Sequence, residues 1–262
     1  MKLGLVTLWI LLGAALTGGA YWTFLITPES TIWSLAASAL LLASAAFLLA
    51  LTLSGAIAGW RHGITIRHAR TALRGVPAFV PAALIVGVVW WLVGNATNRV
   101  TMASGPINAW FIARFGWDDV SWLFTGINWL AAWLTWLVAP SLALALMSGI
   151  IAAGWRTLTR RWWIAYALSP VRLGLATVLV AALVAAPWMY LVPWRPEGLP
   201  DTSLQLAFII GKLTLSAVLM AVGVALVIRL LAADELDASF DEVTASPSPA
   251  TSIFDGPIDP RL

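Results

Sequence analysis

Few residues of this chain have the type and position that chemistry requires, and Lys212 is the first of them. It is the one formal charge well inside a long apolar run, where an ionisable side chain usually marks a functional or structural site. It lies about nine residues from the end of its run, roughly 13 Å along a helix. We expect its ammonium group to snorkel outwards or to pair with Asp201 or Glu197. A substrate or anion contact is the alternative.

The only histidines, His62 and His68, are six residues apart in an arginine-rich segment without nearby acids, and the chain has no cysteine. Zinc sites use three or four Cys, His or carboxylate ligands, so this pair predicts no metal site. The surrounding arginines indicate a cationic surface that attracts anionic lipid by about 1 kcal/mol per residue. The expected lipid contacts are Arg61, Arg67, Arg70, Arg74, Arg156, Arg160 and Arg161.

A third candidate is the carboxylate pair Asp118 and Asp119, in the segment 95–120. Adjacent residues on a helix do not face each other, so the pair favours capping of the following helix over catalysis. Within the same segment, Pro106 to Phe115 predicts a short interfacial or re-entrant helix that Gly116 ends. No nucleophile–base pair, phosphate loop or cofactor motif occurs in the sequence. We therefore expect a protein that is not an enzyme and needs no cofactor.

The elements that position these residues follow from composition. Of 262 residues, 61% are hydrophobic and 10% are charged, against about 25% charged residues in a soluble domain. A membrane-spanning helix needs about 20 apolar residues. Six apolar runs meet this length, at 3–26, 32–58, 77–94, 121–153, 171–194 and 203–232. The sequence predicts an all-α polytopic membrane bundle over 1–232, with short interfacial helices and a kink at Pro140.

The basic residues predict the orientation. Ten of them, in the segments 59–76 and 154–172 together with Lys2 and Arg229, fall on one side of the six runs, and three fall on the other. The basic side is cytoplasmic, so we expect both termini inside, in the inner membrane of a bacterium. Cleavage of a signal peptide near residues 16–20 is the alternative, and it would leave five spans.

The segment 233–262 has one arginine and seven acids, whereas residues 1–232 have a net charge of +9. This composition predicts a disordered, acidic cytoplasmic tail that either docks a cytoplasmic partner or only adds solubility. The basic residues of the membrane domain are where topology requires them, so the net charge of +3 indicates no nucleic-acid partner.

An internal similarity relates residues 54–94 to residues 148–189. Ala58-Gly59-Trp60-Arg61 aligns with Ala153-Gly154-Trp155-Arg156, and Ala72-Leu73 aligns with Ala167-Leu168. The pattern predicts a parallel repeat of one helical hairpin, with Trp60 and Trp155 equivalent. Interfacial anchoring by Trp and Arg is the simpler explanation.

Two stripes predict packing. Ala46, Ala50, Ser54 and Ala58 follow one another at four-residue steps, which lets helices approach closely. On the fourth run Trp122, Trp129, Trp133 and Trp136 share one face. The deep tryptophans of that face pack between helices or face lipid, and an aromatic pocket for a hydrophobic ligand is the third interpretation.

The residues favour a non-enzymatic membrane protein that acts as a scaffold or accessory subunit, packed against lipids and against other membrane proteins or further copies of itself. A small transporter or permease-like component is the alternative. Transport sites usually leave polar groups near the midplane, and the predicted spans offer few.

Overall fold

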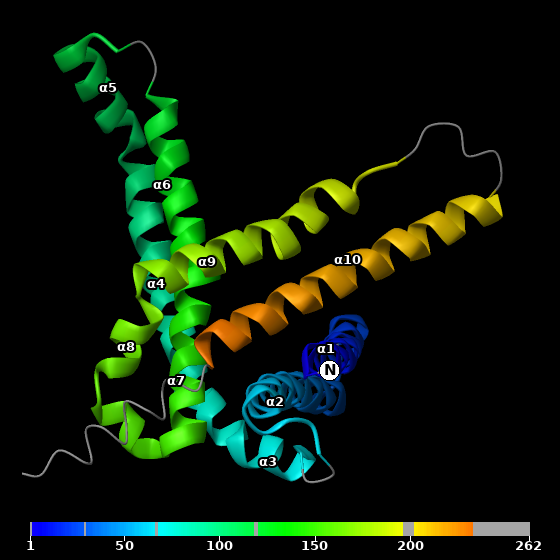
Figure 1. Ribbon diagram of the computed structural model, residues 1–262. Coiled ribbons are helices and arrows are strands. Elements are labelled where there is room, and N and C mark those ends of the chain that lie inside the picture. Colours follow the sequence, from blue (N-terminus) through cyan, green and yellow to red (C-terminus); the bar gives the residue numbers. More distant parts are fainter. Residues whose placement is uncertain (1, 29, 66–67, 118–119, 196–201, 233–262) are drawn as a thin grey trace, which may run out of the picture.

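The computed structural model describes residues 2–28, 30–65, 68–117, 120–195 and 202–232 (Figure 1). In this part of the chain, six helical segments are long and apolar enough to cross a membrane. The prediction of an all-α protein with six candidate spans is confirmed. The six segments are Lys2–Ile26, Ile32–His62, His68–Met102, Ser121–Ala153, Pro170–Leu191 and Ser203–Leu231.

The first two spans are α1 (Lys2–Ile26) and α2 (Ile32–His62). The third comprises α3 (His68–Gly75), the 3-10 turn η1 (Val76–Ala78) and α4 (Phe79–Met102). After α5 (Ser104–Phe115) come α6 (Ser121–Trp133), the π turn η2 (Leu134–Val138) and α7 (Ala139–Ala153). The 3-10 turn η3 (Trp155–Thr159) and α8 (Trp162–Ala167) lead to α9 (Pro170–Val180). The π turns η4 (Ala181–Ala185) and η5 (Pro187–Leu191) precede α10 (Thr202–Leu231).

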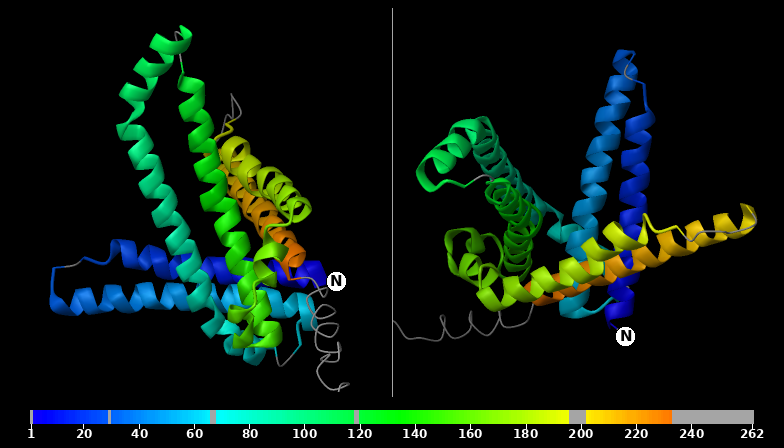
Figure 2. Two further views of the ribbon diagram at one scale, coloured as in Figure 1. Left: turned by 90° about the vertical axis from the view of Figure 1, so that its left-hand side faces the viewer. Right: turned by 90° about the horizontal axis from the view of Figure 1, so that it is seen from above.

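These spans form three antiparallel hairpins that spread from a shared end rather than one parallel bundle. Figures 1 and 2 show the hairpin α1–α2, the hairpin α4–α7 and the hairpin α9–α10 pointing in three different directions. The core lies where they meet, and its largest fully buried side chains include Ile57, Leu146 and Ile228. Beyond this junction the helices are exposed along much of their length, as Leu40 at 70% and Leu84 at 65% illustrate.

Proline distorts two of the spans. Pro140 has no N–H to donate, and directly before it the chain forms η2, in which the Ala139 N–H bonds to the carbonyl of Leu134. This π turn is a local distortion of the helix next to Pro140, and the predicted kink stays a prediction. Pro187 stands at the start of η5, so the fifth span contains two π turns.

Close contacts hold α1 against α2. An added Cβ at Gly13 would meet the side chain of Thr52, and one at Gly55 would meet the indole of Trp9. The Trp9 Nε1 donates to the Thr52 carbonyl oxygen at 3.0 Å. The two glycines therefore permit an approach that a side chain would prevent.

The small-residue stripe of α2 is buried over three of its four members. Ala50, Ser54 and Ala58 are at most 2% exposed, and Ser54 donates to the Ala72 carbonyl of α3 at 2.7 Å. The prediction of a packing face is confirmed for these residues. Ala46 is exposed.

At the Gly-Trp-Arg motifs the structure differs from the predicted repeat. Trp60 lies in the last turn of α2 and donates from Nε1 to the Ala225 carbonyl of α10 at 2.9 Å. Trp155 begins η3 and is 54% exposed, because α7 already ends at Gly154 whereas α2 continues to Gly63. The equivalence of Trp60 and Trp155 is therefore wrong in local geometry.

Other aligned positions do agree in burial: Ser54 and Ser148 are fully buried, as are Ala72 and Ala167. The duplication of 54–94 and 148–189 stays a prediction.

The segment 95–120 contains the short helix that the sequence predicts. The helix α5 ends at Gly116, whose φ of 68° lies in the left-handed region. The helix before it is longer than predicted, because α4 continues to Met102 instead of ending near residue 94. Its polar side chains bond to their own helix: Asn95 donates to the Trp91 carbonyl and Thr101 to that of Thr97. The predicted capping by Asp118 and Asp119 and the predicted disordered tail 233–262 fall outside the described residues.

Candidate functional site

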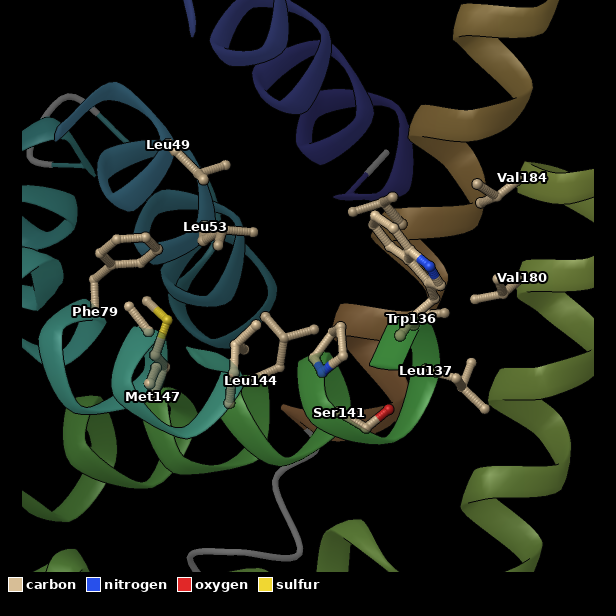
Figure 3. Close-up of a pocket in the computed structure, with 17 residues that line it drawn as sticks. Leu49, Leu53, Phe79, Trp136, Leu137, Ser141, Leu144, Met147, Val180 and Val184 are labelled. Carbon is tan, nitrogen blue, oxygen red and sulfur yellow. The ribbon is translucent and has the colours of Figure 1, made fainter. Parts of the chain in front are cut away.

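A pocket of about 430 Å³ lies where the three hairpins diverge (Figure 3). Ligand pockets in proteins usually measure about 300 to 1,000 Å³. Residues from α2, α4, η2, α7, α9, η4 and α10 form its walls. The lining residues are Leu49, Leu53, Phe79, Ala82, Ala83, Val86, Trp136, Leu137, Pro140, Ser141, Ala143, Leu144, Met147, Val180, Val184, Val224 and Val227.

The walls of this junction pocket are almost wholly apolar. Of the 17 lining residues, Ser141 and Trp136 are the two whose side chains carry a polar atom. A buried water needs two to four polar partners, so water has little to bind here. The pocket is thus suited to an apolar occupant.

Local sequence explains why the pocket forms. Pro140 and η2 lie at one wall, and small residues such as Ala82 and Ala143 leave space at the others. On the opposite side, an added Cβ at Gly223 of α10 would lie 2.8 Å from the Cβ of Leu183 in η4. That close approach fixes α10 against the fifth span, whose Val180 and Val184 line the pocket.

The tryptophan stripe of the fourth span divides between two roles. Trp122, Trp129 and Trp136 are each more than half exposed, in the manner of side chains that face lipid. Trp136 also lines the junction pocket and packs edge-on against Trp90 at a centroid distance of 5.0 Å. Trp133 packs between helices, with Nε1 donating to the Thr177 hydroxyl at 3.1 Å.

Lys212 does not reach this pocket. Its Nζ donates to the carbonyl oxygens of Val192 at 2.6 Å and Trp194 at 2.9 Å. Val192 caps the fifth span, whose helix ends at Leu191 and presents unpaired acceptors and the negative end of its dipole there, and Trp194 lies two residues further along the chain. Lys212 therefore ties α10 to the fifth span. The expected partners Asp201 and Glu197 fall outside the described residues.

The predicted lipid-contacting arginines lie on the elements at the shared end of the hairpins. Arg70 and Arg74 are exposed on α3, and Arg156 and Arg161 are exposed at η3 and α8 (Figure 1). Arg61 is half-buried, and its Nη1 donates to the Ser148 carbonyl of α7 at 3.2 Å, so it joins two hairpins. Arg160 is half-buried, and Arg67 falls outside the described residues.

Comparisons with protein families, with curated proteins and with solved structures find no match.

The two histidines have separate environments. His62 is exposed, whereas His68 is 4% exposed and packs edge-on against Trp9 at 4.9 Å, with its Nε2 unbonded. In the part of the chain that the structure describes, no three His, Asp, Glu or Cys residues lie close enough to hold a metal ion.

Sequence reasoning missed most of the junction pocket. Apart from Trp136 and the kink residue Pro140, its lining consists of aliphatic residues that resemble any lipid-facing surface. The one usable signal is the coincidence of a proline with small residues such as Ser141 and Ala143 in the fourth span.

Proposed function

We propose that this protein is a non-enzymatic integral membrane scaffold or accessory subunit, whose spread hairpins accept helices of partner membrane proteins. The observation that carries the proposal is a set of glycines on the exposed outer parts of all three hairpins. Gly18 of α1, Gly87 of α4 and Gly211 of α10 have no atom outside their own helix within 4 Å of an added Cβ.

Such glycines need an explanation, because glycine in a helix costs about 1 kcal/mol relative to alanine. At Gly13 and Gly55, contacts within the chain explain why the residue is glycine, because a side chain there would clash. At Gly18, Gly87 and Gly211 nothing in the described chain uses the space. Small residues are what lets membrane helices pack backbone to backbone, so a second protein is the natural user of these positions.

A small transporter is the second candidate, and one observation favours it. The fourth and fifth spans are both interrupted by π turns, and transport sites are often built from discontinuous helices. Against it, the junction pocket is apolar and Lys212 is bonded to backbone carbonyls. We rank it below the scaffold for this reason.

The test uses leucine substitutions at these open glycines. Gly18→Leu, Gly87→Leu and Gly211→Leu should leave the isolated protein as stable as the parent, because nothing is displaced. At least one should abolish co-purification of a partner membrane protein, or of a second tagged copy, from native membranes. Ala15→Leu, at an exposed position of α1 that is not a glycine, is the matched control. Absence of any partner, or retention of the partner by all three variants, would contradict the proposal.

We propose that both termini are cytoplasmic in the inner membrane of a bacterium, a location supported by the ten-to-three bias of basic residues. Reporter enzymes fused after Asp201 and after Ala233 are expected to score outside and inside respectively. The opposite result would reverse the orientation. An inside score at both positions would mean that α10 does not span the membrane.

A further inference from the structure

A second pocket of about 370 Å³, lined mainly by apolar residues, adjoins the junction pocket. The two share three lining residues, Leu49, Leu53 and Val224. The second pocket extends along α1, through Ala14 and Gly18, to Tyr21 near the outer end of that helix. From Ile10 to Tyr21 the rise of the helix covers about 16 Å. Together the pockets form one apolar track from the end of a span to its centre.

The two ends of this track have different characters. Tyr21 is 48% exposed, and Trp22 beside it is 64% exposed. Tyr and Trp at the end of a span occupy the headgroup region of a bilayer. In the junction pocket the lining includes Met147, which is 1% exposed and belongs to the core of the junction. The track thus starts at the level of lipid headgroups and finishes among buried aliphatic side chains.

We infer that this track holds one acyl chain of a membrane phospholipid, with its headgroup near Tyr21 and its terminal methyl near Met147. The lining of the track is mainly aliphatic, which suits an acyl chain, and the polar side chains Thr17, Thr52 and Tyr21 belong to the second pocket. The bilayer brings acyl chains directly to the open end. The walls come from all three hairpins, so the chain fills the space around which the hairpins meet.

The test uses the full-length protein in phosphatidylcholine vesicles that contain a phosphatidylcholine with a diazirine near one acyl terminus. After photolysis, peptide mass spectrometry should find the label on Met147. Leu146 is the internal control, because it is equally buried on the same helix but does not line the track. No label on Met147, or equal label on Met147 and Leu146, would overturn the inference.

Variants separate the track from the bulk lipid. Ala143→Phe fills the inner end, and Ala14→Phe narrows the track at an exposed position of α1, where the fold should tolerate it. Both variants should abolish labelling of Met147. If Ala143→Phe does not fold, Ala14→Phe still decides the test. The matched control is Ala15→Phe, an exposed neighbour that does not line the track and should leave the label in place. Equal loss in Ala14→Phe and Ala15→Phe would overturn the inference.

A free fatty acid with the same diazirine distinguishes the source of the chain. The phosphatidylcholine probe alone should label Met147 fully, and excess unlabelled phosphatidylcholine should compete with it. Labelling by the fatty acid and not by the phospholipid would overturn the assignment to a lipid tail. A cross-link between two copies of the chain at Met147 would also overturn it, since a second protein would then occupy the track.

Discussion

Substitution of Gly55 by leucine is expected to separate α1 from α2. The added side chain would meet the indole of Trp9, which packs against α2. Displacing this indole breaks its hydrogen bond to the Thr52 carbonyl and its edge contact with His68. Overpacking of this kind costs about 1 to 3 kcal/mol, and we expect the upper end because the neighbour is a large, held ring.

The measurement is thermal unfolding of the purified protein in detergent, followed by tryptophan fluorescence. Gly18→Leu is the matched control on the same hairpin, since it adds the same side chain where nothing lies within 4 Å. The control should unfold at or above the parental temperature, because it replaces a helix-destabilising glycine. Equal unfolding temperatures for Gly55→Leu and the parent would show that α1 does not pack on α2 in this way.

The limits of sequence reasoning follow from the bilayer as a solvent. The length and polarity of the apolar runs predict the spans, because each span must form its backbone hydrogen bonds within itself across a bilayer of fixed thickness. The short helix ending at Gly116 and the distortion at Pro140 were predictable for a similar reason, since both depend on local backbone chemistry. These features need no knowledge of neighbouring helices.

The spread of the hairpins and the pocket between them were not predictable in this way. Lipid tails are as apolar as leucine, so the sequence of a lipid-facing helix resembles that of one facing another apolar helix. Leu53 and Val224 line the pocket, yet nothing in their type separates them from exposed residues such as Leu40. The alignment of Trp60 with Trp155 has a different limit, because identical residues stand inside the last turn of α2 and after the end of α7.

The sequence identifies Lys212 as an unusual charge in a span, but it does not predict the backbone carbonyls that Lys212 bonds to. Charge matching directs attention to acids, and the nearest acids in sequence are Asp201 and Glu197. The end of a helix inside or near a membrane offers a different partner, because its last carbonyl groups lack donors. Val192, which caps the helix, supplies such a carbonyl to the ammonium group, and Trp194 in the segment that follows supplies a second acceptor. A prediction that considers backbone carbonyls as well as carboxylates would include the hydrogen bonds that Lys212 makes.

Replacement of Lys212 by methionine is therefore expected to loosen α10 from the fifth span. Hydrogen bonds to a charged group contribute about 1.5 to 3 kcal/mol each, and the partial exposure of this site reduces that value. We expect a net loss of about 2 kcal/mol, since methionine also removes a charge that is unfavourable in lipid. Thermal unfolding in detergent measures the loss. Leu213→Met, at the exposed neighbouring position, is the matched control and should be neutral.

A second pair of variants identifies what Lys212 does. Lys212→Arg retains a positive charge and several donors, so it should recover part of the stability if carbonyl bonding is the role. Asp201→Asn should not rescue Lys212→Met, because the carbonyl acceptors stay unpaired whichever acid is neutralised. Rescue would show that a carboxylate is the true partner. Suppose instead that Lys212→Met unfolds at the parental temperature and still co-purifies with the partner membrane protein. Lys212 would then stabilise the fold neither through the backbone carbonyls nor through a carboxylate. A Lys212→Met protein that is stable but has lost an import or export activity would favour the transporter. In that case the ammonium group is needed for transport and not for folding, so it must contact the transported molecule.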